Sequence, residues 1–332
     1  MSNQTKTQNK PVAVLISDVH YNIQTLQVAD AAMKLALEKA DDLHVPLVIA
    51  GDLHDSKANL RGECVNAMLK TIIGLTRPYL LVGNHDKINE KSEEHSLNFL
   101  SGQTLLIDEP RYAKALNAHL IPYQPDVEFL KSYLKTIPPR STLIMHQGIV
   151  GSKAGDYIQD KSAITSEDVA GHRVISGHYH TRQDIVLPDG GLWSYIGNPY
   201  TLGFGEANDP PKGFQVLYND GSLEFIPTNL RKHVIWNETA GVNTDQPSVN
   251  ENDLLWIKIS GTKEQLASIT KRSIPLSMPF RLDLIPIDTT TQAPAAKSLS
   301  KGELLDSLID SLSNTSDLRK LRLKTLWKDL CE

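Results

Sequence analysis

Five short segments near the start of the chain carry side chains that bind metal ions, and each directly follows an apolar run. They supply carboxylate, amide and imidazole groups but no thiolate. This mixture suits Mn²⁺, Fe or Zn²⁺ and disfavours a cysteine-rich structural zinc site. The segments are SDVH at 17–20, GDLHD at 51–55, GNHD at 83–86, HQ at 146–147 and GHYH at 177–180.

Taken singly, none of these segments is diagnostic. An Asp-x-His or Gly-Asn-His-Asp segment after a strand is more often a capped turn, and His146 alone would be an ordinary buried histidine. His178 and His180 carry more weight, because residues two apart in a strand lie on the same face. Five such segments, all after predicted strands, together predict a metal site.

The apolar runs before the segments predict the elements that position them. VAVLIS at 12–17, PLVIA at 46–50 and YLLV at 79–82 are typical of strands buried on both faces. Helix formers over 25–40 and 60–75 separate them, which predicts a parallel sheet with crossover helices. Further strands are predicted at 118–122, 142–145 and 173–176. In open α/β sheets the site lies beyond the carboxyl ends of the strands, where the five segments fall.

The pattern changes after His180. Short runs at 184–187, 193–196, 213–218 and 222–226 are separated by turn residues, which predicts a second, largely antiparallel sheet packed on the first. A strand, a helix and a strand follow, and they predict a small appended α+β domain. We therefore divide the α/β chain into a main domain over 1–230 that holds the five segments, a small capping domain over 231–287, a linker over 288–299 and C-terminal helices over 300–332.

Composition limits the possible partners. The 332-residue chain has a net charge of −5 at pH 7, so it lacks a basic footprint for nucleic acid, and any such contact must use local patches or bound metal ions. Its two cysteines, Cys64 and Cys331, lie far apart and suit a reducing compartment. The polar start and the lack of any apolar run near ~20 residues predict a cytoplasmic chain without membrane contact.

The ligand set is too large for one ion and predicts two divalent cations that share one carboxylate. Two metal ions about 3.5–4 Å apart are the arrangement for in-line displacement at phosphorus, where they neutralise the oxygens of the transition state. The side chains accept Mn²⁺, Fe, Zn²⁺ or Ni²⁺ and do not identify the metal.

In this order, the motifs D-x-H, G-D-x-x-D, G-N-H-D, H and G-H-x-H resemble those of the calcineurin-like metallophosphoesterase superfamily. The resemblance implies a four-layer αββα sandwich. It also implies that His85 contacts the scissile phosphate or protonates the leaving oxygen, and that Asp55 orients His85, although a simple cap or turn role for Asp55 stays open. The implied metal ligands are Asp18, His20 and His180 for the first ion, Asp52 as the bridge, and Asn84, His146 and His178 for the second ion.

Three further segments resemble the Mre11/SbcD nuclease branch of this superfamily, including its compact phage T4-type members. They are YIGNPYTLGFGE at 195–206, KGFQVL at 212–217 and HLIPYQP at 119–125. The branch implies a manganese-dependent exonuclease and endonuclease that acts on DNA ends in recombination or repair. It also implies a homodimer and an ATPase partner of the SbcC/Rad50 type, on which the helices at 300–332 would dock.

Two other functions stay open. The same core would serve a stand-alone phosphatase or cyclic-nucleotide phosphodiesterase, with 231–287 as a lid over a small-molecule pocket. A non-catalytic scaffold is disfavoured because every implied ligand position is filled.

Overall fold

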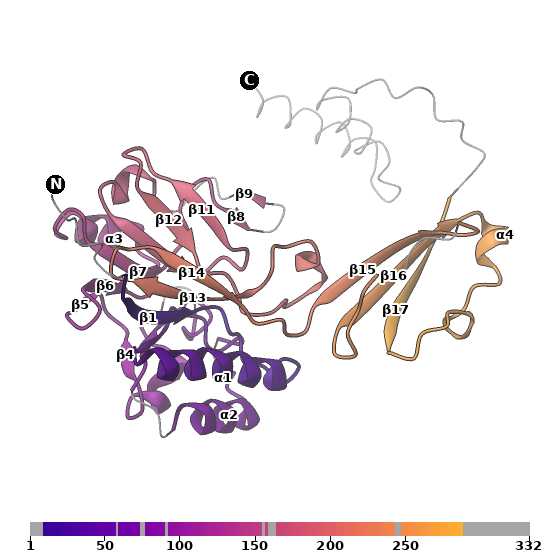
Figure 1. Ribbon diagram of the computed structural model, residues 1–332, viewed down its shortest axis with the longest axis horizontal. Helices are drawn as coiled ribbons and strands as arrows, with labels where there is room; N and C mark the ends of the chain where they lie inside the picture. Colours follow the sequence, from indigo (N-terminus) through magenta and orange to yellow (C-terminus); the bar gives the residue numbers. More distant parts are fainter. Residues whose placement is uncertain are drawn as a thin grey trace, which may run out of the picture.

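The computed structural model of the chain describes residues 9–57, 59–73, 77–89, 92–154, 157–158, 164–242 and 247–287. Two six-stranded sheets form the larger body in Figure 1, and a separate three-stranded sheet projects to one side of it. The predicted linker at 288–299 and the predicted helices at 300–332 lie outside the described residues.

The first sheet has the strand order β14-β13-β1-β2-β3-β4. Strands β1 to β3 are parallel, as predicted, and helices α1 (Leu26–Leu43) and α2 (Gly62–Ile72) connect them. Strand β4, which was not predicted, adds in parallel to β3. The hairpin β13–β14 completes the sheet, with β13 antiparallel to β1. The strands are β1 (Pro11–Ile16), β2 (Leu47–Ile49), β3 (Tyr79–Leu81), β4 (Leu105–Ile107), β13 (Gly213–Tyr218) and β14 (Leu223–Pro227).

The second sheet has the order β11-β12-β10-β7-β6-β5 and is parallel at its centre. Antiparallel pairs occur only at its two edges, β11–β12 and β5–β6. Helix α3 (Val127–Leu134) lies between β6 and β7 in the chain. The strands are β5 (Arg111–Ala113), β6 (Ala118–Ile121), β7 (Thr142–His146), β10 (Arg173–Gly177), β11 (Gln183–Val186) and β12 (Leu192–Tyr195).

The prediction of a largely antiparallel second sheet, built from the segments after His180, is therefore wrong. Only β11 and β12 of those segments join the second sheet, whereas β13 and β14 return to the first. The reason is that β1 has a free edge and β13, buried along most of its length, pairs with it. Local turn chemistry identifies the hairpins but not the sheet to which each hairpin adds.

Three hydrophobic cores separate four layers, which confirms the predicted αββα sandwich. Side chains alternate along β1: Val14 and Ile16 face the core with α1 and α2, whereas Ala13 and Leu15 face the core between the two sheets. On the far side, α3 packs Leu130 against the outer face of the second sheet. Both sheets are thus covered on both faces, which is why their central strands are continuous apolar runs.

The small sheet consists of three parallel strands, β15 (His233–Thr239), β16 (Leu254–Gly261) and β17 (Phe280–Pro286). Leu255, Ile257 and Ile259 of β16 form its core together with Leu266 of the short helix α4 (Lys263–Leu266). Among the residues that the structure describes, no helix has both the length and the apolar character needed to cross a membrane.

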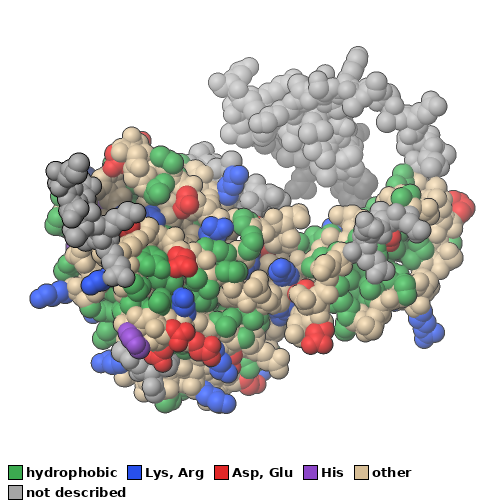
Figure 2. Space-filling model, viewed as in Figure 1, with side chains coloured by type: hydrophobic (Ala, Val, Ile, Leu, Met, Phe, Trp, Pro, Cys, Tyr) green, Lys and Arg blue, Asp and Glu red, His purple; other side chains and the backbone are tan. Residues whose placement is uncertain are grey.

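The remaining elements are short. They are the two-stranded ribbon β8 (Lys153–Ala154) and β9 (Tyr157–Ile158) and the 3-10 helices η1 (Ser96–Leu100), η2 (Glu167–Val169), η3 (Phe204–Glu206) and η4 (Lys271–Ser273). On the face shown in Figure 2, acidic and basic side chains are interspersed among apolar and uncharged ones. This distribution agrees with the modest net charge of the chain.

Candidate metal centre

The five predicted segments converge at one place, but they arrive from two sheets rather than from one sheet edge. Three follow β1, β2 and β3 of the first sheet, and two follow β7 and β10 of the second. The two sheets lie face to face, so the loops that follow the carboxyl ends of their strands enter the same space. Three groups of ligand-type residues there have ligand atoms within 4.8 Å of one another: Asp18, His20 and His180; His20, Asp52 and His85; and Asp18, Asp52 and His146.

The backbone at this place is held in an unusual conformation. Four of the site residues have positive φ angles: Asp18 at 53°, His20 at 50°, Asp52 at 51° and His178 at 91°. Left-handed backbone in a residue other than glycine costs about 1–3 kcal/mol and is concentrated at functional sites. The chain thus turns sharply after β1, β2 and β10, which brings these side chains together.

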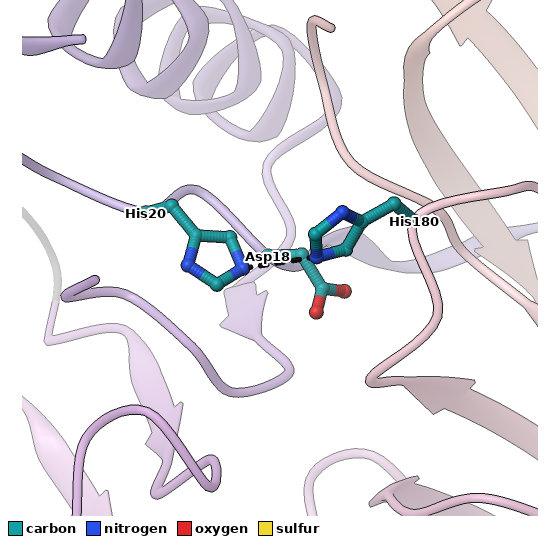
Figure 3. A group of neighbouring side chains, drawn as sticks. All are labelled: Asp18, His20 and His180. Atoms are coloured by element: carbon teal, nitrogen blue, oxygen red, sulfur yellow. Dashed lines mark hydrogen bonds between the residues drawn. The ribbon is translucent and has the colours of Figure 1, made fainter. Parts of the chain in front are cut away.

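His20 and His180 face each other across the first half of the centre (Figure 3). Their Nε2 atoms are 3.1 Å apart. The other nitrogen of each ring is held by a carboxylate: His20 Nδ1 lies 3.1 Å from Asp55 Oδ1, and His180 Nδ1 lies 2.8 Å from Glu206 Oε1. A carboxylate only accepts, so each Nδ1 carries a proton, and the two Nε2 atoms are left to share one further proton or to bind a cation between them. We call Asp18, His20 and His180 the outer half.

The second half has the same arrangement with different supports. His146 Nδ1 donates to the main-chain oxygen of Ala50 at 2.7 Å, so its Nε2 is the nitrogen left for a second proton or for a metal. Two side-chain oxygens lie close to this Nε2: Asn84 Oδ1 at 3.1 Å and Asp52 Oδ2 at 3.2 Å. Nδ1 of His178 lies 2.8 Å from the same Asn84 oxygen. We call Asn84, His146 and His178 the inner half.

Both halves therefore aim unshared electron pairs at one another. Lone pairs at such separations repel unless a proton or a cation lies between them. The donors are imidazole nitrogens, carboxylate oxygens and an amide oxygen, which suit borderline divalent metals. The residues present thus fit two divalent cations, one in each half, as the sequence implied.

Asp52 lies between the two halves. Its Oδ2 is 3.2 Å from His146 Nε2 of the inner half and 3.8 Å from His20 Nε2 of the outer half. Its Oδ1 accepts a hydrogen bond from the main-chain N–H of His85 at 2.8 Å. The carboxylate thus has the position that a bridging ligand requires.

Asp55 contacts a different partner from the one expected. Its carboxylate bonds to His20, and its other oxygen accepts a hydrogen bond from Asn22 at 3.0 Å. The atom that meets His85 Nδ1, at 2.8 Å, is the backbone carbonyl oxygen of Asp55. His85 is therefore oriented by main chain, through its Nδ1.

Burial and charge set the protonation of the inner half. Burial opposes protonation of His146, but the carboxylates of Asp52 and Asp18 outweigh it and raise the pKa of His146 to about 9. Burial, together with the charge of His146, lowers the pKa of His178 to about 4. Burial opposes ionisation of Asp52, yet His146 and His20 lower the pKa of that carboxyl well below its usual range. Without a cation, a proton on His146 takes the place of the metal.

Two glycines let the loops approach this closely. A Cβ at Gly83 would overlap Oδ1 and the main-chain nitrogen of Asp52. A Cβ at Gly51, where φ is 92°, would overlap the His146 ring. These glycines are needed for space next to the ligands and, at Gly51, for the left-handed backbone as well.

The sequence analysis missed two residues that touch the ligands. Glu206 bonds to His180, and burial opposes its ionisation, but that bond and the charge of Lys212 lower the pKa of Glu206 to about 2. The Tyr123 ring stacks on His178, with the centroids 5.9 Å apart and the planes at 27°. Both residues lie in segments singled out by resemblance alone, and neither sits at a ligand-like spacing.

Comparison with models of protein families gave no match, and comparison with curated proteins gave none either. Among solved structures, a dimetal phosphatase from Danio rerio is similar at 12% sequence identity, with a TM-score of 0.45. The similarity covers 63% of this chain and 93% of that chain.

Proposed function

We propose that the chain is a two-metal phosphoesterase whose metal ligands are Asp18, His20, Asp52, Asn84, His146, His178 and His180. One observation carries the proposal. In the His20, His180 and His146 rings, Nδ1 donates a hydrogen bond to an oxygen of the surrounding protein. The Nε2 atoms are therefore the nitrogens that can bind a metal, and all three face a common space. Such a set of second partners is what orients imidazoles for a metal.

Two bound cations would act as Lewis acids on a phosphoryl oxygen and lower the pKa of water. The chain's own part is to hold the centre and to move a proton. Nδ1 of His85 donates to the Asp55 carbonyl, so a second proton on the ring is carried by Nε2. In this imidazolium form, Nε2–H can give its proton to the leaving oxygen of a phosphoester and leaves the ring neutral. Asp52 fixes the His85 main chain, which ties the proton donor to the bridging carboxylate.

Within this class we propose a DNA nuclease of the Mre11/SbcD type, active on DNA ends with Mn²⁺. The support is the resemblance of 119–125, 195–206 and 212–217 to that branch, together with the place of these segments in the fold. They supply Tyr123 against His178, Glu206 against His180, and Lys212, whose Nζ donates to the His180 carbonyl at 3.0 Å. The branch-like segments thus line the centre.

We further propose a homodimer that works with an SbcC/Rad50-like ATPase. The net charge of −5 supports the proposal that a partner contributes to DNA binding. Two basic residues near the centre are already engaged within the protein: Lys212 pairs with Glu206 and Asp209, and Arg182 lies over the Phe225 ring at 4.3 Å. We therefore propose that the metal ions and a partner supply part of the DNA affinity.

The test is hydrolysis with Mn²⁺ of end-labelled linear duplex DNA, bis-p-nitrophenyl phosphate, p-nitrophenyl phosphate and cyclic AMP. Asp52→Asn keeps the shape of the bridging residue and removes its charge, so we expect loss of all turnover. Asp41→Asn, an exposed carboxylate on α1, is the matched control and should behave as the unaltered chain.

The substrates separate the candidate functions. Cleavage of DNA and of the diester supports the nuclease. Turnover of the monoester or of cyclic AMP, with DNA left intact even after addition of the ATPase, would identify a small-molecule phosphoesterase instead. Full activity of Asp52→Asn would contradict the two-metal site itself.

A further inference from the structure

Glu206 lies on the short helix η3, which touches both the metal centre and the small sheet. Its side chain is largely buried, with 15% of its surface exposed. One carboxylate oxygen, Oε1, meets His180 Nδ1 at 2.8 Å. The link therefore runs from η3 to a ligand of the outer half through a single hydrogen bond.

The second oxygen of Glu206 is surrounded by donors. Oε2 accepts from Asn198 Nδ2 at 2.9 Å and from the Leu202 main-chain N–H at 3.0 Å, and Lys212 Nζ lies 3.2 Å away. Lys212 also donates to the main-chain oxygen of His180. The carboxylate is thus fixed on one side by three donors, and its other side is left for the imidazole.

Phe204 starts the same 3-10 helix and reaches the small sheet. Its ring packs edge-on against His233 of β15, with centroids 4.8 Å apart, and against Trp256 of β16 at 5.3 Å. A hydrogen-bond pair strengthens this contact, because Thr201 Oγ1 lies 2.9 Å from His233 Nδ1 and 2.8 Å from the His233 main-chain nitrogen. Residues 201–206 are therefore clamped by the small sheet at one end and hold His180 at the other.

We infer that Glu206 is a positioning residue for His180, and that the small sheet contributes to the metal centre by holding Glu206 in place through Phe204. The inference rests on the proposed function, because it concerns one of the proposed metal ligands. It assigns the small sheet a role besides covering the substrate.

The variant Glu206→Gln tests the link without changing the shape of the side chain. The Oε2 position faces three donors, so it must keep the amide oxygen. The amide nitrogen then takes the Oε1 position and donates to His180 Nδ1. This moves the ring proton to Nε2, the nitrogen that faces His20, and removes the lone pair that a metal needs.

Two measurements read this change. Long-range ¹H–¹⁵N NMR of the metal-free protein reports the tautomer of His180, assigned by comparison with His180→Gln, and we expect the proton to move from Nδ1 to Nε2. Calorimetric titration with Mn²⁺ alone should show one of two binding events weakened by about 10–100-fold. Glu224→Gln is the matched control, a surface glutamate that also accepts a hydrogen bond, from Tyr218, and it should change neither reading.

Phe204 variants test the second part. Phe204→Ala leaves Glu206 in the chain but removes its anchor in the small sheet, so we expect the same Mn²⁺ binding event to weaken. Phe204→Leu keeps an apolar side chain there and should restore most of the affinity. Unchanged affinity in Phe204→Ala would overturn the role of the small sheet.

The failure of this inference is distinguishable from failure of the proposed function. An unchanged His180 tautomer and unchanged Mn²⁺ affinity in Glu206→Gln would overturn the positioning role. The tautomer is read without metal or substrate, so it judges the Glu206–His180 link even if the chain hydrolyses no phosphoester. If Glu206→Gln does not fold, Glu206→Asp keeps the charge but shortens the reach, and an unaltered affinity in that variant would overturn the role too.

Discussion

The two halves of the metal centre present the same lone pairs but are supported in different ways. In the inner half, His146 is fully buried and is oriented by a main-chain oxygen, that of Ala50. In the outer half, His20 and His180 are oriented by the side chains of Asp55 and Glu206, and one third of the His180 side chain is exposed. One half is therefore held by the sheet scaffold and the other by residues on loops.

The contrast shows where the centre can be adjusted. A main-chain carbonyl keeps its place whatever the side chains are, and it adds no net charge. A carboxylate makes its imidazole more basic and depends on the position of the loop that carries it. Substitutions around the outer half should therefore tune metal affinity, whereas substitutions in the inner half should affect the folding of the domain.

After the loss of all turnover expected for Asp52→Asn, the largest effect is expected at His85, which lies beside His20 and Asp52 and belongs to neither half. The ring packs edge-on to His20, with centroids 4.8 Å apart, and its main chain is bound to Asp52. In His85→Ala we expect kcat to fall by about 10²–10⁴-fold, because the leaving oxygen loses its proton donor. The loss should be smaller for bis-p-nitrophenyl phosphate, since p-nitrophenolate needs little protonation. Weakened Mn²⁺ binding in this variant would instead make His85 a ligand.

The next largest difference between the inner and outer halves is expected in the free energy of unfolding. His146→Ala removes the buried partner of Asp52, so the free energy of unfolding of the metal-free protein should fall by about 3–5 kcal/mol. His180→Ala removes a partly exposed hydrogen bond, and the fall should be near 1 kcal/mol. Urea denaturation with both variants measures the difference. Equal losses would remove the distinction between a scaffold-held and a loop-held half.

The pH dependence of metal binding gives the smallest and most specific contrast. The pKa of His146 is raised to about 9 in the metal-free protein, so at neutral pH a cation must displace its proton. Affinity at the inner half should therefore rise about tenfold per pH unit and level off near pH 9. Calorimetry at pH 7.5 in two buffers of different ionisation enthalpy should show release of one proton. Release that persists above pH 10, or none at pH 7.5, would contradict this assignment.

Much of the layered fold, and the side chains that meet at the candidate centre, could be predicted from the sequence, because both depend on local patterns. Continuous apolar runs mark strands buried on both faces, and a polar residue directly after such a run must lie at the strand end. Asp18, Asp52 and His146 could be found in this way. Strand pairing is a long-range property, so the return of β13 to the edge of β1, about 200 residues away in the chain, had no local signal.

The supports of the ligands were equally hidden. Glu206 follows His180 by 26 residues and reaches it only because η3 is anchored elsewhere. Both the carboxylate and the backbone carbonyl of Asp55 can orient a histidine. The spacing of the motif does not show which of the two groups meets which histidine. Residues that orient a ligand are selected by geometry across elements, whereas the ligands themselves are placed by the ends of strands.

The left-handed backbone at four residues lowers the stability of the fold, whereas the side chains of the same residues are the proposed metal ligands. These residues are Asp18, His20, Asp52 and His178. Glycine relieves that strain at any of the four positions, yet no glycine supplies a ligand. A library of variants screened only for resistance to heat should therefore accumulate glycine wherever the relief of strain exceeds the loss of side-chain contacts, and each such variant loses a ligand. Asp52 is excluded, because its buried pair with His146 is worth more than the strain. Screened for hydrolysis, the same library should keep the four residues and gain its tolerance to heat elsewhere, in the three hydrophobic cores.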